Sequence, residues 1–376
     1  MVALARKTLV YEWRRFLPAV LAVGFAGLLQ LLQAALVLGI FGGAAVYITG
    51  SGADIWVGFP GTQSVDQGRS ISPDVATLLH MNPEVSRVEP FLWVDGDWRA
   101  PNTGGVSVFV SGINPGPHGL MFSHALPPHL RERLQTPDAV IVDRADLDKL
   151  GVGIGGSATI NGHRVRVVGV ANGLRALGGV NVVASLDTAR LLDSDPSDIG
   201  RPTYLVAKLR DPKRAQEVVD SLRGHDGFGP YQAWSARDFA RRSMLYWLFD
   251  TGAGAGVLFL AGIVFIVGAV ITSQALVAAV VGSVREYATL NALGVGVRAL
   301  RKVVLEQALW VGLLGLAGAA VLGSMLIGLA RAQDVPVVLD VPVTLACVLL
   351  ILALALVSGV ASMRSLRRAD PATLLR

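Results

Sequence analysis

Four stretches of the chain contain no charged side chain and are long enough to cross a membrane. They cover residues 16–53, 251–284, 307–330 and 341–363. About 20 apolar residues in a helix span the roughly 30 Å hydrocarbon core of a bilayer. Charged residues make up only 16% of the 376 residues, whereas a soluble domain carries about 25%. The sequence therefore predicts a membrane protein with four transmembrane α-helices and argues against a purely cytosolic enzyme.

The distribution of basic residues predicts how these helices are oriented. Lys and Arg outnumber Asp and Glu in segments 1–15, 285–306 and 364–376, but not in the short loop 331–340. Because cytoplasmic segments are enriched in Lys and Arg, we expect both termini and 285–306 in the cytoplasm and 54–250 outside. No basic patch with interleaved aromatic residues is visible, so we expect no nucleic-acid partner. The apolar stretch Phe16–Val46 is about twice as long as a signal-peptide core, which favours a membrane anchor.

The long segment between the first two helices is large enough to fold as a domain. Its pattern predicts a mixture of strands and helices, so the expected fold is four transmembrane helices with a large α+β extracytoplasmic domain inserted between helices 1 and 2. The expected strands are Asp54–Phe59, Val88–Val94, Gly105–Ile113, Ala139–Val142, Ala158–Ile160, Val165–Val170, Tyr204–Leu209 and Gly229–Trp234, and the expected helices are Ser72–His80, Ala145–Leu150 and Pro212–Leu222. Asn161-Gly162 predicts a tight hairpin. Ser235 and Asp238 predict the start of a helix that runs through Trp247 into the second span without a break.

These observations give a map of the whole chain. The predicted segments are a cytoplasmic N-terminal segment (1–15), transmembrane helix 1 (16–46), the periplasmic α+β domain (47–240), a stalk with transmembrane helix 2 (241–284), a cytoplasmic coupling helix and loop (285–306), transmembrane helix 3 (307–330), a short periplasmic loop (331–340), transmembrane helix 4 (341–363) and a cytoplasmic tail (364–376). No internal repeat is visible, which argues against a secondary transporter.

Several motifs with possible chemistry have a simpler interpretation. Gly151–Gly156 matches G-x-G-x-x-G, but a helix precedes it and a strand follows, so we interpret it as a glycine turn. No lysine follows a glycine, so the chain has no Walker A motif. The six histidines lack the spacing of a zinc site. The segment Asn114–Pro128 is expected to be an ordered loop.

The single cysteine, Cys347, excludes a disulfide within the chain. We therefore expect no catalytic residue, metal or cofactor in this chain.

Polar and small residues within the predicted spans indicate helix packing. Gln30 and Gln33 lie three residues apart and share a helix face. Polar groups in lipid usually face other helices, so we expect hydrogen bonds between helices, with the lining of a substrate path as the alternative. Gly252 and Gly256 form G-x-x-x-G, which permits close packing within the chain or between two chains.

The segment after the second span predicts a short cytoplasmic helix. Its sequence, R-E-Y-A-T-L-N-A-L-G over Arg285–Gly294, is rich in helix-forming residues and ends in a glycine that can stop the helix. Held between two membrane helices, such an element can transmit a displacement. A plain polar connector is the alternative interpretation.

This segment resembles the signature of the FtsX/MacB-like permeases of ABC transporters, also called type VII. The matching residues are Arg285, Glu286, Ala288, Leu290, Ala292, Leu293 and Gly294. The stretch Ala139–Asp143 with Leu147, Leu150, Gly151, Gly156 and Val165–Gly169 is similar to the extracytoplasmic domain of that family. The segment Arg364–Ala372 is similar to its C-terminal end. The residues Ala53–Val57 and Pro60–Thr62 resemble the DevC-like branch.

The resemblance implies a mechanism called mechanotransmission. Two permease copies pair, each binds a separate ABC ATPase subunit that holds the ATP, and ATPase dimerisation moves the coupling helix, the stalks and the outer domains. The expected ATPase contacts are Arg285, Glu286, Tyr287, Leu290, Leu293 and Gly294. A periplasmic adaptor and lipid or another amphiphile as cargo are implied as well, in the inner membrane of a bacterium.

Three alternatives remain open at this stage. The same fold serves as an FtsX-like regulator of a cell-wall hydrolase that moves no cargo, or as a lipoprotein-releasing subunit. A membrane-anchored periplasmic enzyme is a further possibility, but residues 54–250 show no catalytic constellation. The sequence names neither the cargo nor the adaptor.

Overall fold

The computed structural model describes residues 11–101, 104–195, 200–223, 226–282, 297–333 and 335–368. The chain forms two compact units. One consists of Met1–Gly39 and Ala255–Arg376, and the other of Ile40–Gly254. We call them the membrane unit and the outer unit.

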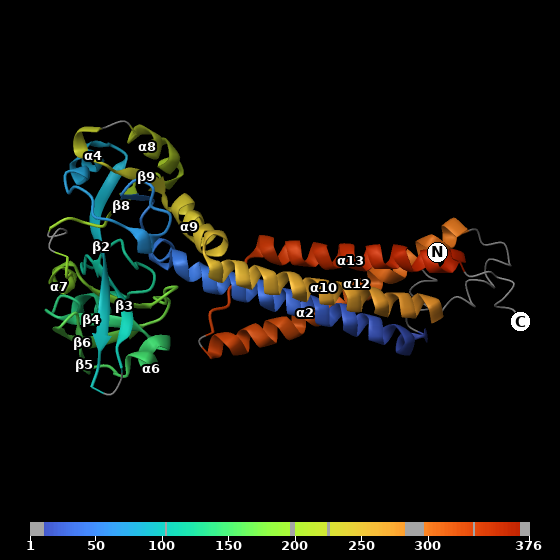
Figure 1. The fold of residues 1–376 in the computed structure, drawn as a ribbon. Coiled ribbons are helices and arrows are strands. Elements are labelled where there is room, and N and C mark those ends of the chain that lie inside the picture. Colours follow the sequence, from blue (N-terminus) through green and yellow to red (C-terminus); the bar gives the residue numbers. More distant parts are fainter. Residues whose placement is uncertain are drawn as a thin grey trace, which may run out of the picture. The chain divides into compact units, whose positions relative to one another are not determined.

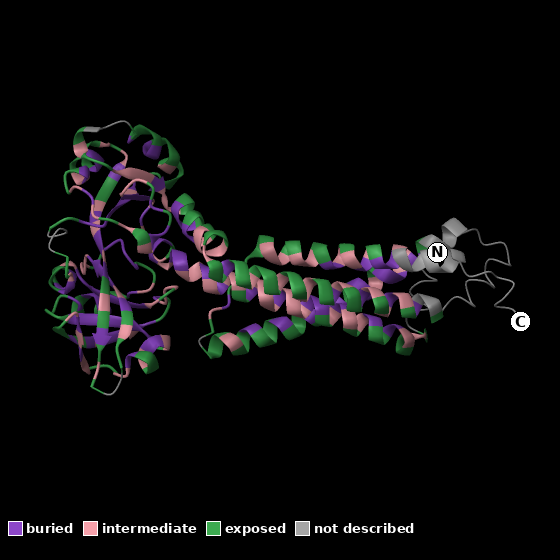
Figure 2. Ribbon diagram, viewed as in Figure 1, coloured by how far each residue is buried: buried purple, intermediate pink, exposed green. Residues whose placement is uncertain are grey.

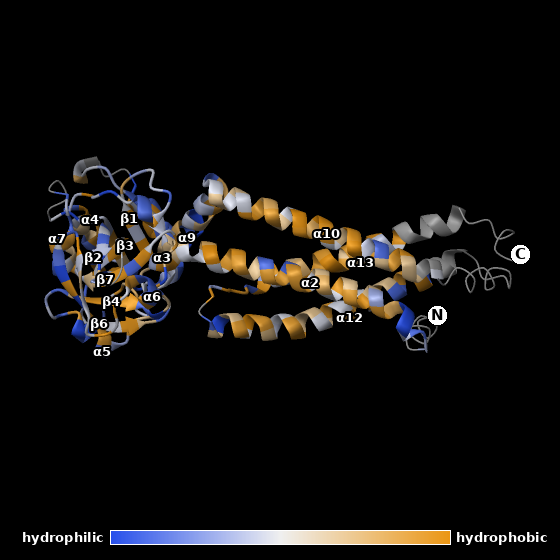
Figure 3. Cartoon of the chain, turned by 60° about the horizontal axis from the view of Figure 1, so that its bottom comes forward, coloured by the Kyte–Doolittle hydropathy of each residue, from blue (hydrophilic) through white to orange (hydrophobic). Residues whose placement is uncertain are grey.

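Four long helices build the membrane unit. They are α2 (Trp13–Gly42), α10 (Gly252–Gly282), α12 (Val297–Ala332) and α13 (Val341–Arg368). Each contains a stretch that is long and apolar enough to cross a membrane, and Figure 3 shows hydrophobic residues along all four. The prediction of four spans with an α/β domain between the first and the second is therefore confirmed.

Glycines allow the helices of the membrane unit to approach closely. A Cβ added at Gly315 of α12 would lie 2.9 Å from the backbone nitrogen of Gly24 in α2, and one at Gly24 would lie 3.1 Å from the Gly315 carbonyl oxygen. A Cβ at Gly359 of α13 would lie 2.8 Å from the Ala308 side chain. Small residues of this kind let backbones pack where no hydrophobic effect drives association. A core drawn from all four helices results, with members such as Val23, Leu276, Val311 and Ile351.

In its described residues, the outer unit consists of nine strands and several short helices (Figure 1). The strands are β1 (Ile55–Gly58), β2 (Val85–Arg99), β3 (Val106–Ile113), β4 (Ala139–Asp143), β5 (Ser157–Ile160), β6 (His163–Ala171), β7 (Val180–Ser185), β8 (Tyr204–Leu209) and β9 (Gln232–Ser235). The helices are α3 (Val46–Thr49), α4 (Val75–Met81), α5 (Pro128–Arg133), α6 (Leu147–Leu150), α7 (Leu186–Leu192), α8 (Ala215–Ser221) and α9 (Ala236–Leu245). Short 3-10 helices are η1 (Gly43–Ala45), η2 (Val65–Gln67), η3 (Arg144–Asp146), η5 (Pro212–Arg214) and η6 (Asp226–Phe228), and a π-helical turn is η7 (Tyr246–Asp250).

One long strand, β2, belongs to two sheets. Its first part, Val85–Phe91, pairs with β8 in a sheet of order β2-β8-β1-β9. Its last part, Leu92–Arg99, pairs with β3 and with β5. Because β3, β7, β4, β6 and β5 follow one another in hydrogen-bonded order, the second group of strands returns to β2 and closes on itself. The strand pattern predicted only the middle of β2, and this closure had no signal in the sequence.

Other sequence predictions in the outer unit are borne out locally. β5 and β6 form the hairpin around Asn161 and Gly162, which both have positive φ, as a type I′ turn requires. Gly151 closes α6 with φ of 64° and β5 follows, so the glycine-rich run is a turn. The ordered loop Asn114–Pro128 is held by Arg131, whose guanidinium donates to the carbonyl oxygens of Asn114, Met121 and Leu126. Strand β7 and helix α7 were not predicted.

The first apolar stretch does not end as a lipid-facing helix. Its last residues form η1 and α3, and Ala45, Tyr47 and Ile48 are buried in the core of the outer unit. Trp56, Phe91, Tyr204 and Phe239 pack in the same core, with Trp56 ring centroids 5.5–5.8 Å from the other three. Figure 2 shows buried residues concentrated on the strands of this unit. The chain that leaves the first span is therefore fixed by aromatic packing.

The predicted unbroken helix from Ser235 into the second span is wrong. Ser235 does cap α9, since its hydroxyl accepts from the backbone nitrogen of Asp238 at 3.2 Å. However, α9 ends at Leu245, a π-helical turn covers Tyr246–Asp250, and Thr251 is extended with φ of −97° and ψ of 144°. The Thr251 hydroxyl donates to the Trp247 carbonyl oxygen at 2.5 Å, which removes an acceptor from the helix. The chain bends before α10 begins at Gly252.

Candidate functional site

The predicted ATPase-contact segment lies outside the described residues. Helix α10 ends at Gly282 and α12 begins at Val297, and the segment lies between these two helices in the sequence. Arg285, Glu286, Tyr287, Leu290, Leu293 and Gly294 all belong to the undescribed stretch 283–296. Their role stays a prediction from the sequence.

The predicted helix-packing residues are placed by the structure, but they do not come together. Gln30 and Gln33 are half-buried on α2. A Cβ added at Gly252 or Gly256 would meet no atom of the described chain within 4 Å. Packing by this G-x-x-x-G pair within one chain is therefore not observed, and packing between two chains stays a prediction. On α10, only 11% of the most apolar stretch is buried, against 28% on α2 and on α12, so the described residues of the chain leave most of α10 uncovered.

The glycine that the local geometry requires is Gly254, between the two that the motif singled out. A Cβ at Gly254 would lie 2.0 Å from the Leu248 carbonyl oxygen, in backbone that cannot move aside. The π-helical turn brings this carbonyl against the first turn of α10. The G-x-x-x-G spacing selects Gly252 and Gly256 and does not single out Gly254.

The two chain segments that connect the outer unit to the spans contact each other. Helix α9, which leads to the second span, packs against η1 and α3, which follow the first span. Phe239 and Ala240 of α9 are buried in the same core as Ala45, Tyr47 and Ile48. A displacement of either segment therefore acts on the other and on the core of the outer unit.

The π-helical turn is tied to η2 and to a glycine before β7. Trp247 donates from Nε1 to the Asp66 carboxylate at 3.3 Å, and Gln67 donates from Nε2 to the Tyr246 hydroxyl at 2.6 Å. A Cβ at Gly178 would lie 3.5 Å from the Trp247 ring. We call Asp66, Gln67, Gly178, Tyr246 and Trp247 the junction site. π-Helical turns inside proteins are rare and are frequent at functional sites.

The charge of Asp66 acts on groups around the junction site. Asp66 accepts from the Ser64 hydroxyl as well as from Trp247. Burial, and then the negative charge of Asp66, raise the pKa of the Tyr204 hydroxyl well above its usual value. Burial and Asp66 also raise the pKa of the Asp95 carboxyl. In the part of the chain that the structure describes, no cluster of three His, Cys, Asp or Glu residues could hold a metal ion. The hydrogen bonds of the junction site hold the π-helical turn in place against η2.

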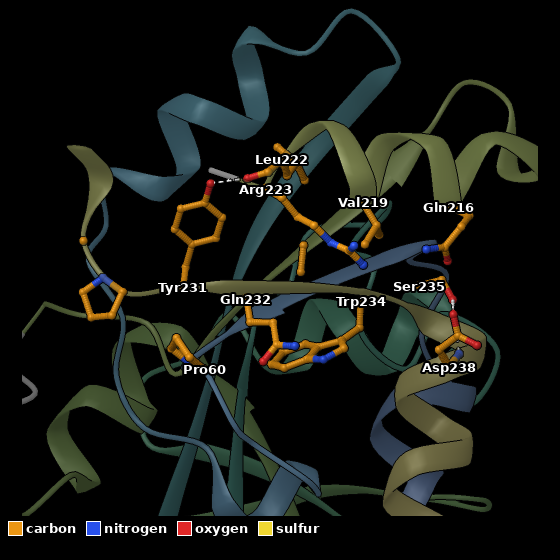
Figure 4. A pocket seen from close by; sticks show the side chains of 13 residues that line it. Pro60, Gln216, Val219, Leu222, Arg223, Tyr231, Gln232, Trp234, Ser235 and Asp238 are labelled. Carbon is orange, nitrogen blue, oxygen red and sulfur yellow. Dashed lines mark hydrogen bonds between the residues drawn. The ribbon is translucent and has the colours of Figure 1, made fainter. Parts of the chain in front are cut away.

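Two hollows of the outer unit lie away from this site. One of about 500 Å³ runs along β9 under α8 (Figure 4). Another of about 620 Å³ is lined by Arg87, His118, His124, Arg131 and Lys208 among others. Lys208 is paired with Asp54 at 3.2 Å, and Arg87 and Arg131 donate to backbone carbonyl oxygens. These cations are therefore occupied in stabilising the loop Asn114–Pro128 and the end of β8.

Comparison with known proteins assigns the chain to a family. The model of the MacB-like periplasmic core domain matches residues 20–225, more than half of the chain. The model of the FtsX-like permease C-terminal region matches residues 258–371. No curated protein matches the chain.

Two solved structures of outer domains are similar to part of the chain. The periplasmic region of MacB from Actinobacillus actinomycetemcomitans is 14% identical, with a TM-score of 0.36, and the match covers 52% of this chain and 94% of that one. The extracellular domain of the noncanonic ABC-type transporter YknZ from Gram-positive bacteria is 12% identical, with a TM-score of 0.34, and the match covers 48% and 99%.

Four apolar helices with an α/β domain inserted after the first define a multi-pass membrane protein with a large domain outside the bilayer. With both family models matched in their proper order, the chain belongs to the family of MacB- and FtsX-like ABC transporter permeases. The resemblance read from Arg285–Gly294 and from the outer domain is confirmed at the level of the family. Proteins of this family are the permease components of ABC transporters and work with an ATPase partner.

Proposed function

We propose that this chain is the membrane subunit of an ABC export system that works by mechanotransmission. In this proposal a separate ATPase subunit binds and hydrolyses ATP, and this chain carries neither cofactor nor catalytic residue. Two copies of the chain sit in the inner membrane of a bacterium with both termini in the cytoplasm. A periplasmic adaptor completes the system, and the cargo is a lipid or another amphiphile.

The observation that supports the proposal best is the contact between the two connecting segments. Because α9 packs against η1 and α3, a relative movement of the first two spans changes a packed core rather than a free linker. Close-packed interiors respond to such a change by switching between arrangements and do not deform continuously. A movement that begins at the cytoplasmic side is thereby delivered to the outer unit without a channel through the membrane.

The ATPase-docking role of Arg285–Gly294 completes the proposal. Tyr287 and Arg285 are of the residue types that dominate the centre of docking interfaces, where loss of one side chain costs about 2 kcal/mol or more. A single exposed substitution at a membrane surface changes stability by only about 0.5 kcal/mol. Tyr287→Ala is therefore expected to weaken ATPase binding while the amount of the chain in the membrane stays the same.

The test uses the full chain in lipid nanodiscs with its ATPase subunit. Tyr287→Ala and Gly294→Val are compared with Ser283→Ala, a matched control in the same segment. We expect both variants to lose ATPase co-purification or stimulated hydrolysis, and the control to keep them. If both variants bind the ATPase fully and stimulate its hydrolysis fully, the docking role is wrong and the segment is a plain polar connector.

A second measurement separates export from signal transmission. Proteoliposomes containing the permease, its ATPase and a fluorescent phospholipid are supplied with ATP, and transfer of the lipid to an external acceptor is followed. ATP-dependent release supports export. Hydrolysis without release, together with activation of a cell-wall hydrolase, would support the FtsX-like regulator instead.

A further inference from the structure

Among the residues that the structure describes, strand β9 leaves one edge of its sheet without a partner strand. In the sheet β2-β8-β1-β9, the strand Gln232–Ser235 pairs with β1 alone. The backbone nitrogen of Ala236 donates to the Asp54 carbonyl oxygen at 2.9 Å, and Trp234 lies opposite Trp56 in the same register. Since backbone groups alternate in direction along an antiparallel strand, the N–H and C=O groups of Ala233 point away from β1. An edge of this kind is a ready template for another extended chain.

The open edge lies inside a groove. The hollow of about 500 Å³ is lined by Pro230–Ser235, by Gln216, Val219, Leu222 and Arg223 of α8 and the residues after it, and by Pro60, Gly229 and Asp238. Figure 4 shows Gln216, Val219 and Arg223 on one side of β9 and the side chains of Gln232 and Trp234 on the other. A groove between a helix and a strand edge matches the way in which several domains bind peptides by strand addition.

A buried tryptophan forms one wall of the groove. Trp234 is 7% exposed and stacks on Phe239 with ring centroids 4.7 Å apart, so its indole is fixed. Its Nε1–H has no hydrogen-bond partner among the residues that the structure describes. The nitrogen itself is buried, so the indole forms part of the fixed wall of the groove and does not contact a bound segment.

We infer that this groove binds an extended segment of a partner protein, which adds as a strand to the free edge of β9. The flanking side chains favour a single extended chain over the edge of a second folded copy, because the helices that cover a folded sheet would collide with α8 and Pro60.

The positive charge of Arg223 favours a partner segment with an acidic side chain. Arg223 reaches from the end of α8 over β9, and its only described ion-pair partner is Asp220 at 3.2 Å, in a pair that is largely exposed. Exposed pairs contribute little, so an acidic side chain on the α8 side of the added strand can replace Asp220.

The test selects random seven-residue peptides on phage against the full chain in lipid nanodiscs. Selected peptides are labelled, and their dissociation constants are measured by fluorescence anisotropy. The key variant is Ala233→Pro, which removes the outward N–H and leaves the bonds of Trp234 to β1 in place. We expect it to weaken binding at least tenfold. Ala233→Val keeps the N–H and adds similar bulk, and it is expected to stay within about threefold of the unaltered chain.

Two further readouts make the outcome decisive if Ala233→Pro disturbs the fold. Hydrogen exchange should slow at the Ala233 amide when peptide binds, while the Trp234 amide is already slow. Arg223→Glu should weaken the selected acidic peptides, and peptides with Lys in place of the acid should recover affinity for this variant. Equal affinity for Ala233→Pro and Ala233→Val, unchanged exchange at Ala233, or a failure to select any peptide would overturn the inference. Slowed exchange that depends on protein concentration without peptide would assign the edge to a second copy of this chain.

Discussion

Trp247 and Asp66, separated by 181 residues in the sequence, are joined by a hydrogen bond of 3.3 Å from the indole nitrogen to the carboxylate. Asp66 lies in η2, and the carbonyl oxygen of its neighbour Val65 accepts from the Tyr204 hydroxyl at 2.8 Å. Tyr204 packs on Trp56 and Phe239 in the core of the outer unit. Two hydrogen bonds to neighbouring residues of η2 thus connect the turn that leads to the second span with the aromatic core. Trp247 bonds to Asp66, and Tyr204 bonds to Val65.

The first prediction concerns this connection. Trp247→Phe removes the N–H and keeps most of the ring. Hydrogen bonds to charged groups contribute about 1.5–3 kcal/mol, and this one is partly exposed, so we expect the free energy of unfolding of the outer unit to fall by about 1–2 kcal/mol. Amide exchange in Val65–Gln67 should become faster. Phe249→Leu, at an exposed position of the same turn, is the control and should leave exchange in η2 unchanged. Equal exchange in the two variants would contradict the connection.

The second prediction separates three neighbouring glycines. Gly254→Ala places a methyl group against the Leu248 carbonyl oxygen, whereas Gly252→Ala and Gly256→Ala place it in open space within the chain. Overpacking of this kind costs about 1–3 kcal/mol. We therefore expect Gly254→Ala alone to lower the melting temperature in detergent.

The same series tests packing between copies. If Gly256 packs against a second copy, Gly256→Leu should shift the chain from dimer to monomer in light-scattering measurements. Its melting temperature at high dilution should remain that of the unaltered chain. A dimer that is unaffected by Gly256→Leu would remove the G-x-x-x-G pair from the dimer interface.

The sequence predicted the parts of the fold that depend on local or compositional signals. The four charge-free stretches, the Asn161-Gly162 hairpin and the glycine turn at Gly151 each have a direct physical cause in the residues themselves. The bend at Thr251 was missed because Ser235 and Asp238 are a strong helix start and the prediction extended that helix through Trp247 into the apolar span, past Gly252 and Gly254. It depends instead on Trp247 finding Asp66 far away in the sequence. Strand β7 was missed because all six of its residues are buried, so it lacks the alternation that marks a half-exposed strand.

The candidate site was less accessible to sequence reasoning than the fold. The G-x-x-x-G spacing selects Gly252 and Gly256, yet only Gly254 lies where an added Cβ would collide with the backbone at Leu248. Nothing in the sequence near Asp66 or Gln67 marks them as partners of the stalk, since no helix or strand is predicted between Phe59 and Ser72. Contacts between distant segments depend on the tertiary fold, so local patterns in a single sequence do not predict them.

The third prediction concerns the crossing of α2 and α12. Gly315→Val forces a branched side chain toward the backbone of Gly24 and the side chain of Val23, which lie 2.9 Å from the position of the added Cβ. We expect the chain to be destabilised by about 2 kcal/mol or more, or to accumulate at a lower level. Gly318→Val lies one turn away, and an added Cβ there meets nothing within 4 Å. Thermal denaturation in detergent that gives the same midpoint for both variants would contradict the close crossing.

The fourth prediction concerns Arg131, which is 2% exposed and organises the loop Asn114–Pro128. Burial lowers the pKa of its guanidinium, and the nearby Glu89 opposes this change. Arg131→Met leaves the carbonyl oxygens of Asn114, Met121 and Leu126 without their donors, so we expect a loss of about 3 kcal/mol. Arg133→Met removes one exposed hydrogen bond to Val168 and should cost less than about 1 kcal/mol. Limited proteolysis should cut the loop in the first variant and spare it in the second.

The last prediction tests the orientation on which the proposed function depends. The excess of basic residues in 1–15, 285–306 and 364–376 predicts that these segments lie in the cytoplasm and the outer unit lies outside. In a variant with Cys347→Ala, single cysteines are introduced as Ser194→Cys and Ser283→Cys. Ser194 is exposed on the outer unit, whereas Ser283 precedes the proposed coupling helix. A membrane-impermeant maleimide added to intact cells should label position 194 and spare position 283, and lysis of the cells should make position 283 reactive. Labelling of 283 with protection of 194 would invert the topology, and a permease whose outer unit faces the cytoplasm could not deliver ATP-driven movement to cargo outside the membrane.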